Sequence, residues 1–222
     1  MTIAEQLTQT MEPLLDAVYE AGKKTGGVGL FTYASRPRQL FYEVDFGGRD
    51  EIEIEMPNIG NADISEMFAK AKGYNRLTAI FAPGVAHNGY RFIQGLSTGG
   101  SSIEELTMID GMKFSRFDGF AQYCINLTTI NGRIDLSGCT TAGYLNQCFL
   151  SCSKLVNVSF VPNRIPLSIS FAQSPKLSEA SIASIINGLS TEAYGQTLTV
   201  HQTVAEQITE TDVTDRGWTL AY

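Results

Sequence analysis

A phrase of about ten residues that occurs twice constrains the fold of this chain more than any other feature. The stretches FAQYCINLTTI, residues 120–130, and FLSCSKLVNV, residues 149–158, both begin with Phe and place a Cys three residues before a Leu. Each phrase then has Ile or Val three residues after that Leu. Recurrence every ~20–29 residues is typical of leucine-rich repeats, whose strand-and-loop units bury their apolar sides only by stacking. Weaker copies stand at Leu77/Ile80, Leu106/Ile109 and Leu177/Ala180.

The repeated positions predict a core. Stacking brings equivalent side chains into columns, so each column must stay apolar and similar in size. The predicted core residues are Phe120, Cys124, Leu127, Ile130, Phe149, Cys152, Leu155 and Val158.

The four cysteines fit this core better than they fit a chemical site. They are Cys124, Cys139, Cys148 and Cys152. Their spacing matches neither a zinc site nor the disulfide framework of a short secreted chain. We therefore expect buried structural thiols, no metal and no cofactor.

The beginning of the chain carries the signals of a helix. Thr2 and Glu5 form a capping box, and apolar residues recur at helical spacing until Gly22 ends the pattern. The apolar stripe is Ile3, Leu7, Met11, Leu14 and Val18. We predict an attachment or oligomerisation helix over residues 1–25; the alternative is a helix packed on its own domain.

The segments on both sides of the repeats favour further strands and helices. Residues 40–56 predict two strands around Gly47–Gly48, and the alternation in EIEIEM puts Ile52, Ile54 and Met56 on one face of an edge strand. Towards the C-terminus we expect a helix capped by Ser178, a strand over 196–200, a short helix ended by Gly217 and a final strand in WTLAY.

Together these patterns predict a β-rich α/β chain, a leucine-rich-repeat solenoid with an N-terminal helix and an α/β C-terminal cap. The predicted parts are the helix over 1–25, a β-rich connector or N-terminal cap over 26–60, the repeats over 61–177 and the cap over 178–222.

Composition and motifs disfavour several classes of function. A net charge of −7 makes nucleic acid a poor partner. No run approaches the ~18 apolar residues that a membrane span needs. The motif GLSTG puts Ser97 in the nucleophile position, but its Gly/Ser-rich surroundings predict a loop, and no carboxylate pair is marked out for sugar hydrolysis. We expect a protein without enzymatic activity.

Polar and aromatic residues of the returning loops are candidates for a binding surface. For each of them, an ordinary solvated loop position is the alternative. The candidates are Tyr90, Arg91, Arg116, Asp118, Arg133 and Tyr144.

Both copies of the repeated phrase and both ends of the chain resemble a known family. The repeats at 120–130 and 149–158 resemble BspA-like leucine-rich repeats, although the copies around Leu77 and Leu106 lack the Cys. The start, MTIAEQLTQ followed by VYEAGKK, and the tail from SEASIASIINGL to WTLAY are similar to the ends of leucine-rich-repeat proteins encoded by bacteriophages and prophages of gut bacteria.

The resemblance implies a structural protein of a virion, assembled in the host bacterial cytoplasm. It implies a part of a tail fibre, head fibre or other surface appendage, a homotrimer held to other virion proteins by its N-terminal segment. The exposed loops would then contact a glycan or a protein of the host surface. A bacterial surface adhesin with leucine-rich repeats is the alternative, against which the missing signal peptide argues.

Overall fold

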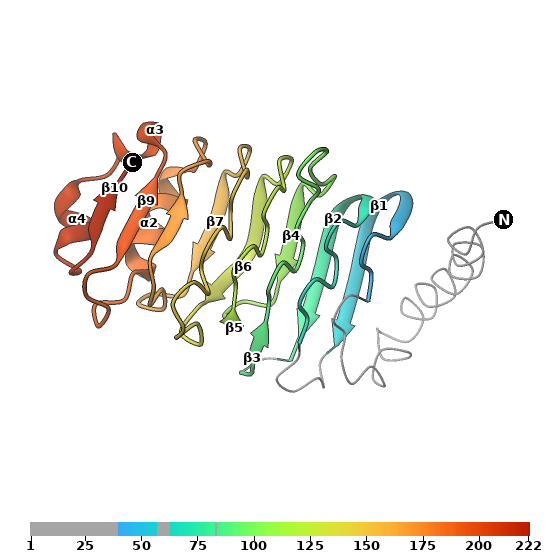
Figure 1. Ribbon diagram of the computed structural model, residues 1–222, viewed down its shortest axis with the longest axis horizontal. Coiled ribbons are helices and arrows are strands. Elements are labelled where there is room, and N and C mark those ends of the chain that lie inside the picture. Colours follow the sequence, from blue (N-terminus) through green and yellow to red (C-terminus); the bar gives the residue numbers. More distant parts are fainter. Residues whose placement is uncertain (1–39, 57–62, 83) are drawn as a thin grey trace.

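Parallel strands that stand side by side along the length of the molecule dominate the fold (Figure 1). The computed structural model describes residues 40–56, 63–82 and 84–222. The strands are β1 (Asp45–Met56), β2 (Lys72–Phe81), β3 (Ala86–Asn88), β4 (Glu105–Met108), β5 (Met112–Arg116), β6 (Thr129–Asp135), β7 (Asn157–Phe160), β8 (Ile169–Phe171), β9 (Thr197–Val200) and β10 (Thr219–Ala221). The helices are α2 (Glu179–Gly188), α3 (Gln202–Ala205) and α4 (Glu210–Thr214).

The first seven strands form one curled sheet. Its order is β1-β2-β4-β6-β5-β3, and β7 also pairs with β6. The curl follows from β6, which pairs with β4 through Ile130 and with β5 through Ile134. Because β4 and β5 follow each other along the chain, the single strand β6 pairs with both arms of one bent segment. The remaining strands form a second sheet in the order β10-β9-β8.

Tight turns, not helices, return the chain between most of these strands. Backbone N–H groups of one turn run donate to carbonyls of the next, for example from Phe68 to Phe92, from Ile93 to Phe120 and from Ala121 to Cys148, each at 2.9 Å. These bonds satisfy main-chain groups that no strand pairs. The turn runs cover residues 64–71, 89–95, 117–124 and 141–152.

The turn runs depend on left-handed backbone at residues that are not glycine. Lys70, Tyr123 and Ser151 have φ angles of 58°, 63° and 63°. The backbone N–H groups of Lys70 and Tyr123 donate to carbonyls of the next turn run, and Ser151 occupies the equivalent place in its own run. Such a conformation costs roughly 1–2 kcal/mol per residue. The hydrogen bonds between adjacent runs must offset this cost.

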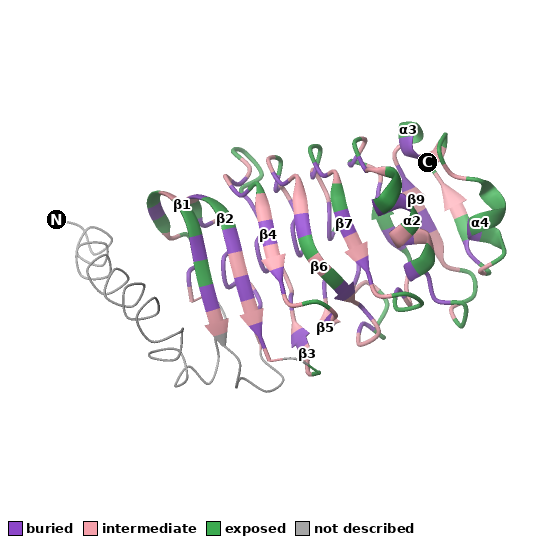
Figure 2. Cartoon of the chain, turned by 180° about the vertical axis from the view of Figure 1, so that it is seen from behind, coloured by how far each residue is buried: buried purple, intermediate pink, exposed green. Residues whose placement is uncertain are grey.

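The core lies between the sheet and the turn runs and contains stacked phenylalanine rings. The ring centroids of Phe117 and Phe120 are 4.0 Å apart, and those of Phe149 and Phe171 are 4.9 Å apart. All eight predicted core residues are buried. Figure 2 shows the resulting bands of buried and exposed residues along the strands.

All four cysteines are buried free thiols, as expected. The thiol of Cys124 donates to the carbonyl of Ile93 at 2.9 Å, and that of Cys152 donates to Ala121 at 3.1 Å. Burial raises the pKa of Cys124 to about 12. These thiols therefore tie neighbouring turn runs together and stay protonated.

Helix α2 closes the open edge of β7 with serine hydroxyls. Val158 and Phe160 of β7 donate their backbone N–H groups to the side chains of Ser181 and Ser184, at 3.0 and 2.9 Å. Ser178 caps the helix, as predicted, by accepting from the N–H of Ser181. Unpaired strand edges are sites of aggregation, so this cover protects the end of the large sheet.

The other elements predicted near the C-terminus are also present. The strand over 196–200 is β9, the short helix is α4, and the final strand is β10. Gly217, which follows α4, has a φ angle of 79°.

The prediction of a leucine-rich-repeat solenoid is wrong. The chain forms a curled parallel sheet with few helices, an α/β-like arrangement, and the repeated phrase does not keep one position in it. Leu106 lies inside β4 and pairs with Ile130, whereas Leu127 and Leu155 precede β6 and β7. After Leu177, the helix α2 takes the place of a strand. The spacing of the repeated phrase predicted buried positions correctly, but it does not mark a repeating structural unit.

Two smaller predictions at the N-terminal side have different outcomes. Residues 45–56 form one strand and not two. Gly47 and Gly48 adopt left-handed backbone at an irregularity of β1, and the strand pairs with β2 on both sides of it. The alternation is confirmed, since Ile52 and Ile54 are buried and β1 lies at the edge of the sheet order. The predicted helix over 1–25, with its apolar stripe, lies outside the described residues.

Candidate functional site

Five of the six predicted surface residues meet in one place. We call this group the aromatic–arginine cluster. It comprises Tyr90, Arg91, Arg116, Asp118 and Tyr144.

Three neighbouring segments of backbone bring the cluster together. Asn88 of β3 pairs with Arg116 of β5 just after an irregularity in the ladder, and the backbone N–H of Arg91 donates to the backbone carbonyl of Asp118 at 3.1 Å. The N–H of Phe117 donates to Tyr144 at 3.0 Å, which adds the next turn run. The cluster therefore depends on pairing between segments far apart in sequence.

Local backbone chemistry sets the direction of Tyr90. Its N–H donates to the side-chain oxygen of Asn88 at 3.1 Å, which makes a tight Asx turn. Gly89 lies between them, and a Cβ there would be 2.7 Å from the ring of Phe114. Only glycine lets this turn pass over the buried phenylalanine.

The guanidinium of Arg116 lies at the centre of the cluster. Its Cζ is 4.0 Å from the ring centroid of Tyr90 and 5.3 Å from that of Tyr144. Arg91 places its Cζ 4.8 Å from the ring centroid of Tyr90. All three distances are within the ~6 Å over which a cation is attracted to an aromatic face.

Carboxylates balance the two arginines. Arg116 donates from Nε to Oδ1 of Asp118 at 2.6 Å and from Nη2 to Oδ2 at 3.0 Å, and these hydrogen bonds raise the pKa of Arg116. Arg91 is 3.9 Å from the carboxylate of Glu66. With two cations and two anions, the cluster and its neighbour Glu66 have no net formal charge.

The side chains of the cluster are ordered by their contacts and remain partly exposed to solvent. The side chain of Arg116 is 36% exposed and that of Asp118 is 17% exposed, and both tyrosines are partly exposed. A planar, bidentate ion pair between stacked rings restricts the rotamers of all its members. A ligand would meet side chains that are already ordered.

The sixth predicted residue, Arg133, lies apart from the cluster on β6. It forms an ion pair with Asp110 at 2.6 Å, in which the side chains are 50% and 59% exposed. Hydrogen bonds from Arg133 lower the pKa of Asp110 to about 2. This pair is a surface contact between β6 and the connection from β4 to β5.

Sequence reasoning missed two features of this side of the molecule. Glu66, which faces Arg91, carries no motif that would have marked it. Lys70 lies 4.9 Å from the ring centroid of Tyr42 and 2.9 Å from the carboxylate of Glu43. This second cation–aromatic group has the same chemistry, and no spacing in the sequence links its residues.

Two features that bear on chemical sites can be compared with the structure: possible metal ligands and the GLSTG motif. Among them, no group of three or more His, Cys, Asp or Glu side chains is placed to hold a metal ion. Ser97 lies in a tight turn closed by hydrogen bonds between Leu96 and Gly100, and not between a strand and a helix. The hydrolase motif at 95–99 therefore lacks its required context.

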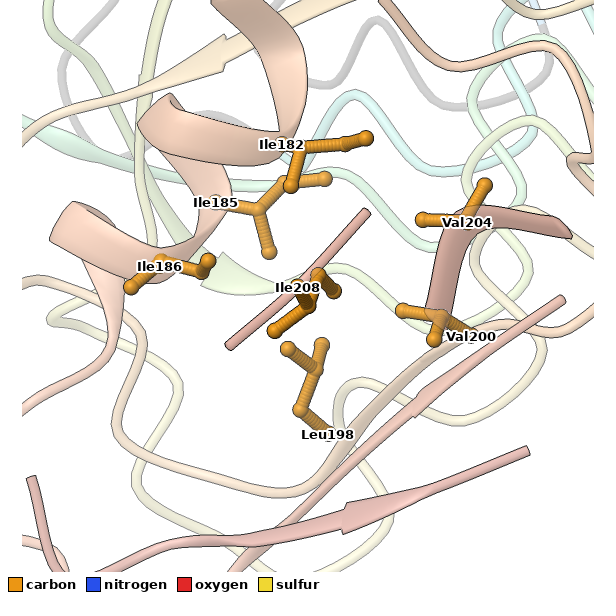
Figure 3. A pocket seen from close by; sticks show the side chains of 7 residues that line it. All are labelled: Ile182, Ile185, Ile186, Leu198, Val200, Val204 and Ile208. Carbon is orange, nitrogen blue, oxygen red and sulfur yellow. The ribbon is translucent and has the colours of Figure 1, made fainter. Parts of the chain in front are cut away.

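A cavity between α2, β9 and α3 is purely apolar (Figure 3). A site that orients a small molecule needs a few placed polar groups as well as an apolar wall. The side chains that line this cavity are Ile182, Ile185, Ile186, Leu198, Val200, Val204 and Ile208. We assign it to the packing of the helices on the second sheet.

Comparison with known proteins gives no relative. No protein-family model matches the chain, and neither a curated protein nor a solved structure is significantly similar to it. In the part of the chain that the structure describes, no helix has the length and apolar character needed to cross a membrane.

Proposed function

We propose that this protein is a structural, non-enzymatic component of a bacteriophage particle that contacts the host surface through its turn runs. It would belong to a fibre, tail or capsid-surface appendage. The observation that carries the binding role is the aromatic–arginine cluster, five side chains from three backbone segments ordered on one face. The assignment to a phage particle rests on the resemblance of the two ends of the chain alone, because the leucine-rich-repeat interpretation is wrong.

The scaffold around the cluster suits a surface that must bind without rearranging. Beside it, the amide of Gln94 donates to Gln122 at 2.6 Å, and that of Gln122 donates to Gln147 at 2.9 Å. This row of amides crosses three turn runs and is parallel to the backbone ladder. A preordered surface loses little conformational entropy on binding, which favours affinity.

The proposed attachment to the particle uses the predicted N-terminal stripe. Ile3, Leu7 and Met11 recur at helical spacing, as an assembling helix requires. A homotrimer, held to other virion proteins by residues 1–25, is part of this proposal.

Co-sedimentation with particles tests the proposal. Purified particles should contain the full chain, whereas a chain without residues 1–25 should remain in the supernatant when mixed with particles that lack the protein. A truncated chain that still sediments would contradict the attachment role. Recovery of the protein on bacterial surfaces in the absence of particles would favour the adhesin alternative.

A further inference from the structure

The aromatic–arginine cluster retains unused hydrogen-bonding capacity. A guanidinium has five N–H groups, and Arg116 uses two of them on Asp118. Among the described residues, no further partner is seen for the other three or for the hydroxyls of Tyr90 and Tyr144. The carboxylate of Asp118 accepts one bond from Arg116 on each oxygen and has room for more. Donors and acceptors thus lie next to each other between aromatic rings.

The charge of the cluster restricts the ligand. Its positive side chains are balanced by Asp118 and Glu66, and the whole chain carries a net charge of −7. A polyanion would be repelled by the chain and would find no unbalanced cation here. A ligand with neutral hydroxyl groups fits better.

The size of the cluster also restricts the ligand. Neighbouring backbone segments of a ladder are about 4.8 Å apart, so three of them span about 10 Å. A stable protein partner covers roughly 800 Å² on each side. A patch built on three segments matches a ligand of one or two sugar rings better than a protein surface.

From these observations we propose that the cluster is a binding site for a neutral hexopyranose polysaccharide. The inference rests on the proposed host-surface role and names the ligand class. The C–H face of a pyranose packs on the ring of Tyr144, which a single guanidinium contacts, because the electron-rich face of the ring attracts weakly positive hydrogens. Adjacent ring hydroxyls accept from Arg116 and donate to Asp118. The ion pair between these residues keeps both groups in one plane for this purpose.

Electrophoresis of the full chain in native gels that contain a polysaccharide tests the inference. The neutral probes are dextran, mannan and galactan, and alginate is the anionic comparison. We expect at least one neutral polysaccharide, and not alginate, to retard the protein. Tyr144→Ala and Arg116→Lys should each weaken the association about tenfold, because they remove a ring face or the planar donor fork. Tyr194→Ala, at a remote side chain that is 79% exposed, is the matched control and should bind as the unchanged protein does.

Fluorescence of Trp218, which is buried in the C-terminal part, and a thermal melt verify that each variant is folded. The inference is overturned if none of the neutral probes retards the protein, if alginate alone does, or if folded Tyr144→Ala binds equally well. Those results would leave attachment to particles untouched. Conversely, absence of the protein from particles would refute the proposed function even if the cluster binds sugar.

Discussion

Truncation of Phe120 is the sharpest test of how the core is built. This side chain is fully buried, and its ring centroid lies 4.0 Å from that of Phe117, 5.4 Å from Phe114 and 5.5 Å from Phe92. The ring of Phe120 therefore contacts one ring from the sheet, that of Phe114, and two rings from turn runs, those of Phe92 and Phe117. Phe120→Ala removes all of these contacts and leaves a cavity where the stacked segments meet.

The expected cost can be derived from these contacts. Each aromatic pair contributes about 0.5–1.5 kcal/mol beyond buried area, so the three pairs involve about 1.5–4.5 kcal/mol. Truncation of a buried Phe to Ala costs about 3–5 kcal/mol in total. We expect Phe120→Ala to lower the free energy of unfolding by about 4 kcal/mol, and Phe120→Leu by less than half of that.

Urea denaturation followed by far-ultraviolet circular dichroism measures this loss. Ile125→Ala is the control, because Ile125 follows the same turn run and is 38% exposed. We expect the control to lose less than about 1 kcal/mol. If Phe120→Ala loses no more than the control, the ring contacts do not hold the turn runs to the sheet and the account of the core is wrong.

Three further predictions concern buried groups. Ser181→Ala should lower the free energy of unfolding by about 1–3 kcal/mol in the same denaturation assay, since it leaves the N–H of Val158 without its acceptor; an unchanged midpoint would show that α2 does not close the edge of β7. Burial lowers the pKa of His87, so its stabilising effect is complete above the unfolded value of about 6.5 and is lost as pH falls towards the folded value. The Tm in thermal melts should therefore fall as the pH is lowered below ~6.5, and it should fall less steeply in the variant His87→Gln. Parallel profiles of Tm against pH for the two proteins would contradict this. In the native protein Cys124 should resist iodoacetamide, as followed by mass spectrometry, because its pKa is raised to about 12, and rapid labelling before unfolding would contradict its burial.

Much of the burial pattern could be predicted from the sequence, because it is local. The alternation in EIEIEM placed Ile52 and Ile54 in the core, and Ser178 marked the start of α2. The Cys and Phe positions of the repeated phrase are buried for the same reason, since apolar side chains recur where the chain returns to the core.

The register could not be predicted in this way. The phrase puts Leu106 and Leu127 in equivalent positions, yet Leu106 pairs with Ile130. The turn before each strand decides this offset, and it depends on left-handed residues such as Tyr123 that no spacing identifies. A solenoid of like repeats requires equivalent positions to pair throughout, and the pairing of Leu106 with Ile130 departs from that requirement.

In the candidate site, too, the residue types could be predicted from the sequence and their arrangement could not. Tyr90 and Tyr144 were recognisable as exposed loop aromatics, but their shared contact with Arg116 requires the pairing of β3 with β5 and of two turn runs. Arg133 looked equivalent in the sequence and lies elsewhere, paired with Asp110. Side-chain type could therefore nominate members of the site, and only the fold could group them.

Adhesion of the full chain to host cells tests the central claim most directly. The claim is that the aromatic–arginine cluster carries the contact with the host surface. The unchanged protein and Tyr194→Ala should adhere equally. The folded double variant Tyr90→Ala/Tyr144→Ala should lose about nine-tenths of the adhesion or more, because a tenfold loss is already expected from Tyr144→Ala alone. Equal adhesion of the double variant would contradict the claim and place the contact on another surface.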